Sequence, residues 1–278
     1  MLINFTKAQA YGNDFLFVEE STAKTEHAVV QLVREACDRS KGIGADGFIF
    51  YRRTDTGSAT KLFNADGTMA EVSGNGVRCM AAILVDGEER FQKSTTTEQI
   101  QEVVVETDGG IKTLTLLNVD PPRYYFRAFM GKPHGLKKQV LDLDGQQIEV
   151  VVLSMGNPQC VVLTEHLNEA NFGRLGPLLT KHDFFPSGTN VEFVEVERPD
   201  KIRILIWERG VGPTTSSGTG SCASAVAAAA YGGGAQVINV ISPGGSQKVE
   251  WSTEGVYLTG WAEVTEKGQW FGSRNVDR

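Results

Sequence analysis

The feature that most constrains this chain is an internal repeat in which matching segments lie 144 residues apart. Gly12-Asn13 precedes Ser73-Gly74-Asn75-Gly76, and Gly156-Asn157 precedes Ser217-Gly218-Thr219-Gly220 with the same offset. The offset is about half of the 278 residues, whereas the repeats of solenoid proteins span roughly 20 to 50 residues. We therefore expect two similar halves related by a pseudo-twofold axis.

Two further positions agree with this repeat. The offset carries Asp46 onto Asn190 and Asn64 onto Glu208, so polar residues fall opposite polar residues between the glycine-rich segments. Chance is a weak explanation for so many coincidences in register.

Hydrophobic patterning predicts a strand-rich chain. Short apolar or alternating runs predict strands at 14–19, 47–52, 103–106, 147–155, 190–197, 202–208 and 237–241. Helices are predicted at 26–39, 76–85 and 221–231, the last of which stops at three consecutive glycines. Because strands and helices do not alternate regularly, an α+β architecture is favoured over a doubly wound parallel sheet.

Composition narrows the classes of partner. The chain has 27 Lys and Arg against 34 Asp and Glu, with no basic block, which argues against nucleic acid and anionic membrane as partners. It begins without a signal-peptide pattern and its apolar runs are too short to span a bilayer, so we expect a cytoplasmic protein. The four cysteines and four histidines lack C-x-x-C and zinc-ligand spacing, so we expect buried reduced thiols and no metal site.

Three well-known motifs do not account for the glycine-rich segments. Gly42-Ile-Gly44-Ala-Asp-Gly47 matches G-x-G-x-x-G but follows a predicted helix and precedes a strand, the reverse of the dinucleotide-binding context. The segment from Gly218 to Ala223 opens a helix, but no phosphate-loop lysine follows, which disfavours a nucleotide-binding module. Neither Ser73 nor Ser217 lies in G-x-S-x-G, so a hydrolase nucleophile is unsupported.

Each Ser-Gly-x-Gly segment stands directly before a predicted helix. Ser73 and Ser217 are therefore expected to cap these helices, and the exposed backbone amides at a helix start attract anions. If both loops meet at one substrate carboxylate, the two serines flank the attached carbon on opposite sides. Inversion of a stereocentre needs this arrangement, because one group removes the proton and the other returns it. A single loop would be explained as a capped helix start, but two in register favour a site.

Taken together, these residues resemble the diaminopimelate epimerases, a family of cofactor-independent amino-acid epimerases. The motifs that carry the resemblance are Tyr11-Gly-Asn-Asp-Phe15, Asp38-Arg-Ser-Lys-Gly-Ile-Gly-Ala-Asp-Gly47, Phe63-Asn-Ala-Asp-Gly-Thr-Met-Ala-Glu71, Gly74-Asn-Gly-Val-Arg-Cys79, Met155-Gly-Asn-Pro158, Gly188-Thr-Asn-Val-Glu-Phe193, Trp207-Glu-Arg-Gly210 and Gly218-Thr-Gly220. The resemblance implies an α+β fold of two pseudo-symmetric lobes, each a curved, strand-rich sheet around a central helix. We expect one lobe to span 1–118 plus 264–278 and the other 119–263, with the active site in the cleft between them.

The resemblance also implies an activity and a set of site residues. The family inverts one stereocentre of LL-diaminopimelate to give the meso isomer for lysine and peptidoglycan synthesis, without cofactor or metal and often as a homodimer. The loop residues that correspond to the cradle for the reacting carboxylate are Gly74, Asn75, Gly218 and Thr219. The residues that match the positions holding the ammonium groups and the distal carboxylate are Asn13, Asn64, Asn157, Asn190, Glu208 and Arg209. The planar fork of Arg209 suits that carboxylate because it can donate two hydrogen bonds.

The sequence departs from the family at its acid/base positions, where Ser73 and Ser217 replace cysteines. A thiol, with a pKa near 8.5, gives an accessible anion at neutral pH, and a hydroxyl does not. Cys79 and Cys222 lie past the loops, inside the predicted helices, so we expect them in the core. Gln159 is also placed in the substrate site, where it replaces the histidine that the family has after Gly-Asn-Pro.

Three interpretations of the serine pair follow. The chain is an engineered Cys-to-Ser form, a natural epimerase that activates hydroxyls, or a diverged relative that binds an amino acid or acts as an isomerase or dehydratase on another small carboxylate. Gln159 favours natural divergence, because disabling the thiols gives no reason to change the histidine. The retained Asn, Glu and Arg set argues for an unchanged substrate class. We therefore predict a diaminopimelate epimerase with Ser73 and Ser217 in the catalytic positions.

Overall fold

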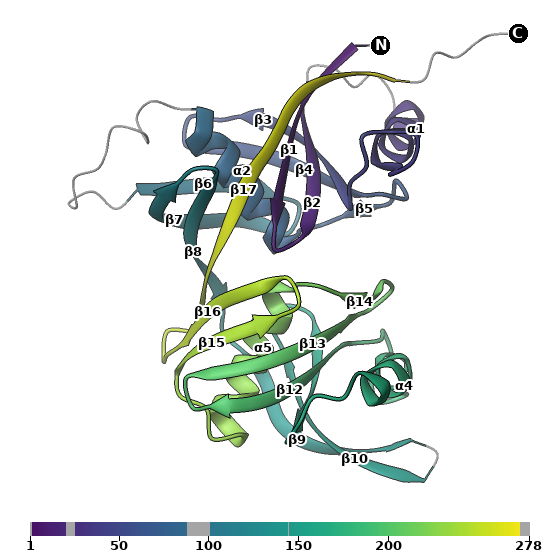
Figure 1. Cartoon of the computed structure of the whole chain (residues 1–278), viewed down its shortest axis with the longest axis vertical. Coiled ribbons are helices and arrows are strands. Elements are labelled where there is room, and N and C mark those ends of the chain that lie inside the picture. The colour runs from purple at the N-terminus through teal and green to yellow at the C-terminus, as the bar shows by residue number, and fades with distance from the viewer. Residues whose placement is uncertain (1, 21–25, 88–100, 144, 273–278) are drawn as a thin grey trace, which may run out of the picture. The chain divides into compact units, whose positions relative to one another are not determined.

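The computed structural model describes residues 2–20, 26–87, 101–143 and 145–272 (Figure 1). Contacts divide the chain into two compact units, the first comprising Met1–Arg127 with Trp261–Arg278 and the second comprising Ala128–Gly260. Residues 273–278 of the expected first lobe lie outside the described part of the chain.

The first unit is a mixed sheet built around a buried helix. Its strands are β1 (Leu2–Ala10), β2 (Asn13–Glu19), β3 (Gly47–Arg53), β4 (Gly57–Asn64), β5 (Met69–Ala70), β6 (Gln101–Thr107), β7 (Gly110–Asp120) and the first part of β8 (Arg123–Gly131), which continues into the second unit from Ala128. The pairs β2–β3 and β4–β6 are parallel, and β1–β2, β3–β4, β4–β5 and β6–β7 are antiparallel. Helix α1 (Glu26–Cys37) packs on one face, and α2 (Gly74–Gly87) is the central helix.

The second unit repeats this plan. Its strands are β9 (His134–Leu143), β10 (Gln146–Ser154), β11 (Pro158–Thr164), β12 (Asn190–Arg198), β13 (Lys201–Glu208), β14 (Gly212–Thr214), β15 (Val237–Ser242) and β16 (Gly245–Trp251). The pairs β11–β12 and β13–β15 are parallel, and β9–β10, β10–β11, β12–β13, β13–β14 and β15–β16 are antiparallel. The helices are α4 (Glu169–Thr180) and the central α5 (Gly218–Tyr231). The long strand β17 (Val256–Phe271) starts beside β16 and ends beside β1.

The repeat seen in the sequence is therefore a repeat of structure. The order strand, strand, helix, three strands, helix, two strands occurs once from β1 to β7 and again from β10 to β16. Strands β1 and β4 and helix α2 coincide with β10, β13 and α5 when 144 is added to their residue numbers. The expected strand-rich α+β class is confirmed.

The three predicted helices are present, and sequence patterning missed a fourth. Both central helices begin at the first glycine after the capping serine, which is earlier than predicted. The prediction placed both starts later because glycine has a low helix propensity. The missed helix is α4, which contains Gly173, Gly176 and Pro177 and so lacks the pattern of a helix former. Its start is fixed by Asn168, whose side chain accepts a hydrogen bond from the Asn171 amide.

The central helices are buried on all sides. In α2 every residue from Asn75 to Val85 is buried, and α5 is built almost entirely from Gly, Ala, Ser, Cys and Val. A helix that is apolar all round is typical of a protein core rather than of a surface. The small side chains of α5 pack against Ile202, Ile204 and Val240 of the surrounding strands. This packing fixes the position at which each helix starts.

Strand pairing corrects one part of the sequence repeat. In the second unit Gln159 of β11 pairs with Asn190, whereas in the first unit the equivalent Phe15 of β2 pairs with Gly47. Gly47, and not Asp46, is therefore the structural counterpart of Asn190. A one-residue difference before β3 is compensated after it, so the offset of 144 holds on both sides and hides the slip.

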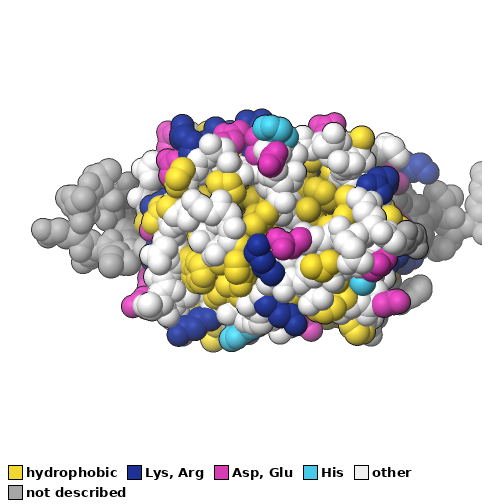
Figure 2. Space-filling view, turned by 90° about the horizontal axis from the view of Figure 1, so that it is seen from below, with side chains coloured by type: hydrophobic (Ala, Val, Ile, Leu, Met, Phe, Trp, Pro, Cys, Tyr) yellow, Lys and Arg dark blue, Asp and Glu magenta, His cyan; other side chains and the backbone are white. Residues whose placement is uncertain are grey.

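The outer surface carries mixed charge. On the face shown in Figure 2, basic and acidic side chains are interspersed with hydrophobic atoms, and the described side chains of that face form no continuous basic surface. Within the described ranges, none of the helices has the length and apolar character needed to cross a bilayer.

Candidate active site

The two serines predicted as caps make the same hydrogen bonds. Ser217 is the N-cap of α5 and has an extended backbone, with φ −140° and ψ 126°. Its Oγ accepts from the Gly220 amide at 3.2 Å, and its carbonyl accepts from the Ser221 amide at 2.9 Å. Ser73 Oγ accepts from the Gly76 amide at 3.1 Å in the same way. The capping prediction is confirmed for both.

The amides between each serine and the capped residue remain available to a ligand. Gly74 and Asn75 in the first unit, and Gly218 and Thr219 in the second, are the first two residues of their helices. Amides at these positions have no intrahelical acceptor and carry the positive end of the helix dipole. The sequence-predicted cradle for a carboxylate therefore has the right chemistry in both units.

In the first unit, side-chain hydrogen bonds connect the start of β2 to the first turn of α2. Asn75 Nδ2 donates to Asn13 Oδ1 at 3.2 Å, and Asn13 Nδ2 donates to Asp46 Oδ2 at 2.9 Å. The buried guanidinium of Arg78 donates to Asn75 Oδ1. These contacts hold the predicted residues Asn13 and Asn75 together. Asn64, at the end of β4, instead donates to Thr68 Oγ1 at 2.9 Å.

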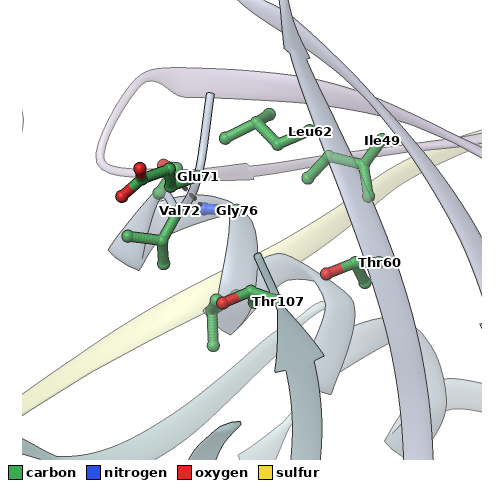
Figure 3. A pocket seen from close by; sticks show the side chains of 9 residues that line it. Ile49, Thr60, Leu62, Glu71, Val72, Gly76 and Thr107 are labelled. Atoms are coloured by element: carbon green, nitrogen blue, oxygen red, sulfur yellow. Dashed lines mark hydrogen bonds between the residues drawn. The ribbon is translucent and has the colours of Figure 1, made fainter. Parts of the chain in front are cut away.

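A small hollow opens beside Ser73 (Figure 3). It is lined by apolar side chains of β3, β4 and α2 and by polar groups that include Glu71 and Thr107. In Figure 3 the Ile49 and Leu62 side chains lie along one side of the hollow, and Gly76 lies near its centre. The hollow therefore gives Ser73 a partly apolar surrounding.

The second unit has the matching connection. Asn157 Nδ2 donates to Thr219 Oγ1 at 3.4 Å, and these residues are the counterparts of Asn13 and Asn75 in the repeat. Gln159 Nε2 donates to Asn157 Oδ1 at 2.7 Å. Gln159 is fully buried, so its side chain holds Asn157 in place through this hydrogen bond and is not itself exposed to a ligand.

Three predicted residues form one row across the second sheet. Gln159 pairs with Asn190, and the antiparallel register of β12 and β13 places Glu208 on the other side of Asn190. Asn190 Oδ1 accepts from the Arg209 amide at 2.9 Å, and Arg209 Nη1 donates to the Ser187 carbonyl at 2.8 Å. The row brings an amide, a carboxyl and the start of an arginine side chain to one end of the sheet.

Glu208 is held against the capping serine of its own unit. Burial raises the pKa of Glu208, and a hydrogen bond from the Ser217 side chain opposes that rise because it stabilises the ionised carboxylate. The hydroxyl thus donates to a carboxylate whose proton affinity is higher than usual. The family resemblance assigns Glu208 to substrate binding, and the structure adds this contact with Ser217.

The cysteines are elsewhere. Cys79 and Cys222 are fully buried in α2 and α5, which confirms the expectation that they are core residues. Burial raises the pKa of the Cys79 thiol, so little of it ionises to the reactive thiolate at neutral pH. Across the described ranges of the chain, no group of three or more His, Cys, Asp and Glu side chains is arranged to hold a metal ion.

One buried carboxyl in this region was missed at the sequence level. Glu192 lies on β12, two residues after Asn190, and is 0% exposed. The available signal was the alternation of β12, which places residues 190, 192 and 194 on the same face as the apolar core. A carboxylate in such an inward position is unusual.

The chain matches a known protein family along most of its length. The family model described as diaminopimelate epimerase matches residues 5–134 and 151–265. The diaminopimelate epimerase of Desulfitobacterium hafniense is 36% identical over 96% of this chain and 97% of its own length. Diaminopimelate epimerase 1 of a Nostoc species is also 36% identical, over 97% of this chain and 100% of its own.

Solved structures show the same fold at much lower identity. A probable proline racemase from Agrobacterium radiobacter, solved with bound carbonate, superposes with a TM-score of 0.70 at 16% identity, covering 99% of this chain and 94% of that chain. A phenazine biosynthesis protein of the PhzF family from Bacillus anthracis superposes with a TM-score of 0.69 at 13% identity, covering 98% and 99%.

Proposed function

The chain belongs to the diaminopimelate epimerase family, and we propose that it interconverts LL- and meso-diaminopimelate by proton transfer at one carbon. One observation carries this proposal beyond the family resemblance. The same capped loop is built twice, with a serine that accepts from the third amide and an asparagine from the preceding hairpin that reaches the loop. Two equivalent acid/base positions are what inversion without a cofactor requires.

The acid/base roles fall to Ser73 and Ser217. One hydroxyl, as its anion, takes the proton from the substrate carbon, and the other gives its own proton to the opposite face of that carbon. The helix-start amides at Gly74 and Asn75, and at Gly218 and Thr219, stabilise the negative charge that develops on the substrate carboxylate. Glu208 assists Ser217, because it accepts that hydroxyl's hydrogen bond.

Selectivity for diaminopimelate is assigned to the polar residues at the ends of β4 and β13. Asn64, Asn190 and Glu208 supply amide and carboxylate oxygens for an ammonium group, and the guanidinium of Arg209 suits the distal carboxylate. The same proposal includes a cytoplasmic homodimer that supplies a precursor for lysine and peptidoglycan. Sedimentation velocity of the full chain measures the oligomeric state.

The test is loss of the α-proton signal of LL-diaminopimelate in deuterium oxide, followed by proton NMR together with the appearance of the meso isomer. We expect exchange by the natural chain that is lost in Ser73→Ala and in Ser217→Ala. The double variant Ser73→Cys/Ser217→Cys is the matched control, because it places a thiol at both positions on a side chain of the same length.

Each outcome decides between functions. Exchange by the serine form supports a hydroxyl-based epimerase. Exchange only in the double cysteine variant means that the site binds diaminopimelate while the serine form lacks turnover. Absence of exchange in both forms refutes the assignment, and a screen of other small carboxylates then follows.

A further inference from the structure

Glu192 occupies a place that should be apolar. Its neighbours across the sheet are Val161 on β11 and Ile206 on β13, and both belong to the core that surrounds α5. Neither carboxyl oxygen of Glu192 has a hydrogen-bond partner, and the residue is fully buried. An unpaired buried carboxylate is costly enough that such a group keeps its proton instead.

The side chain ends directly beneath the loop that holds Ser217. A Cβ atom added at Gly220 would lie 2.8 Å from Glu192 Oε1 and 3.2 Å from Ser217 Oγ. The two oxygens therefore flank the same point and can be no farther apart than those two distances together. Glycine at 220 leaves room for the carboxyl, because any larger residue would displace it.

The other half of the molecule provides an internal control. A Cβ at Gly76 would lie 2.9 Å from Ile49 Cδ1 and 3.6 Å from Ser73 Oγ. The corrected strand register makes Ile49 the counterpart of Glu192. An isoleucine thus fills this place adequately in one half, so packing alone does not explain a glutamate in the other.

The titratable groups around Glu192 favour its neutral form. Glu208 on β13 and Cys160 on β11 interact with it electrostatically, and the Cys222 thiol of α5 lies in the same core. Burial raises the pKa of Glu192 well above its usual range, and the negative charge of Glu208 raises it further. Within the described part of the chain, no lysine or arginine forms an ion pair with either glutamate. The negative charge on Glu208 therefore opposes ionisation of Glu192.

We propose that Glu192 is a neutral carboxylic acid beneath the Ser217 loop that donates a hydrogen bond to Ser217 Oγ when that oxygen becomes anionic, and that Glu208 carries the single negative charge of the pair. A neutral acid in an apolar site can stabilise a developing oxyanion that an ionised one would repel. Glu192 is thus a positioning residue that favours the anionic form of Ser217 and leaves Glu208 free to accept the hydroxyl proton. This role rests on the proposed function, whereas the protonated state of Glu192 does not.

Three variants separate these statements. Glu192→Gln keeps a donor without a titratable proton, Glu192→Ile installs the residue type used in the other half, and Ile49→Gln controls for an amide beneath the equivalent loop. Each is made in the natural chain and in the Ser73→Cys/Ser217→Cys background, so that slow hydroxyl chemistry does not hide an effect.

The protonated state is measured without activity. Infrared difference spectra between the natural chain and Glu192→Gln at pH 7 should lose the carbonyl band of a protonated acid, and loss of a carboxylate band instead overturns the proposal. Because the folded pKa is raised, the native state binds the extra proton. The natural chain should therefore lose stability against denaturant, relative to Glu192→Gln, as the pH rises from about 5. A constant difference across the pH range contradicts a buried neutral acid.

The donor role is measured by α-proton exchange. We expect Glu192→Ile to slow exchange by about 10²-fold, and Glu192→Gln and Ile49→Gln to stay within about threefold of the parent at pH 7. The exchange rate of the parent should fall at high pH, and this fall should be absent in Glu192→Gln. A merely structural role of Glu192 would not produce that difference. Exchange by Glu192→Ile at the parent rate shows that Glu192 only occupies space in the core, which overturns the donor role. If neither the serine form nor the double cysteine form shows α-proton exchange, the proposed function and this donor role fail together. The infrared result on the protonation of Glu192 still stands in that case.

Discussion

Removal of the Ser217 hydroxyl should cost both stability and chemistry, and the two losses can be separated. Ser217 is 6% exposed, and its Oγ accepts from the Gly220 amide, which is itself buried. Loss of an N-cap serine costs about 1 kcal/mol, and a buried amide without an acceptor costs about 1 to 3 kcal/mol. Because water cannot replace the lost oxygen, we expect Ser217→Ala to lower the free energy of unfolding by about 2 kcal/mol. For a chain of this size that corresponds to a Tm roughly 4 to 8 °C lower.

The serine of the first unit should respond in the same direction. Ser73 is only half-buried, but the Gly76 amide that donates to its Oγ belongs to a buried residue, so Ser73→Ala leaves a buried amide without that acceptor. We expect a cost of about 1 to 2 kcal/mol there. Both alanine variants should slow α-proton exchange by about 10²-fold or more, because each removes one of the two proposed acid/base groups.

A cap outside the site provides the control. Asn168 caps α4 by accepting from the Asn171 amide at 2.9 Å and is exposed. Asn168→Ala should cost about 1 kcal/mol of stability and leave exchange unchanged. Urea unfolding followed by tryptophan fluorescence gives the stabilities, and proton NMR in deuterium oxide gives the exchange rates. The reasoning is refuted if Ser217→Ala unfolds at the same urea concentration as the natural chain, or if Asn168→Ala slows exchange as much as Ser217→Ala.

Three further predictions concern other parts of the chain. Burial alone would raise the pKa of Asp14, but hydrogen bonds from Arg39 and Lys7 lower it, so the natural chain should lose stability relative to Asp14→Asn as the pH falls from about 5 to 3 in urea titrations. Gly57→Ala should destabilise the protein by more than about 2 kcal/mol, because the added Cβ would lie 1.9 Å from the Val104 carbonyl oxygen. In Gly173→Ala the added Cβ meets no atom within 4 Å and the residue is helical, so this variant should be more stable by roughly 0.5 to 1 kcal/mol. Calorimetry measures both changes. Arg209→Lys should raise the KM for diaminopimelate by about tenfold with a smaller change in kcat, since a lysine cannot donate two parallel hydrogen bonds to one carboxylate; an unchanged KM removes Arg209 from the site.

Much of this architecture could be predicted from the sequence because the same pattern of residues occurs in both halves of the chain. Matching glycine-rich segments at a constant offset indicated two halves, and the serines before them indicated capped helices. Helix α4 was missed because its two glycines and Pro177 contradict helix propensity, and tertiary packing of Phe172, Leu175 and Leu179 overrides that preference. Local propensity carries no information about such packing.

The site was predicted less completely, since its geometry depends on strand register. A constant offset placed Asp46 opposite Asn190, whereas pairing places Gly47 there. The slip matters because it makes Ile49, and not Phe48, the counterpart of Glu192. Without the register, Glu192 is one glutamate in an apolar strand, and its position beneath Ser217 cannot be inferred.

The two halves therefore differ in the one property that a hydroxyl mechanism needs. A serine is a weaker acid than a cysteine, so its anion requires more help from the surroundings. Ser217 has Glu208 as hydrogen-bond acceptor and Glu192 below its loop. At the corresponding positions Ser73 has Asn64 and Ile49, neither of which can accept a proton. In the proposed reaction each inversion uses both serines once. We therefore expect the half in which neither corresponding position is a carboxyl to limit the overall rate, and replacement of the Ser73 hydroxyl by a thiol to change the reaction most.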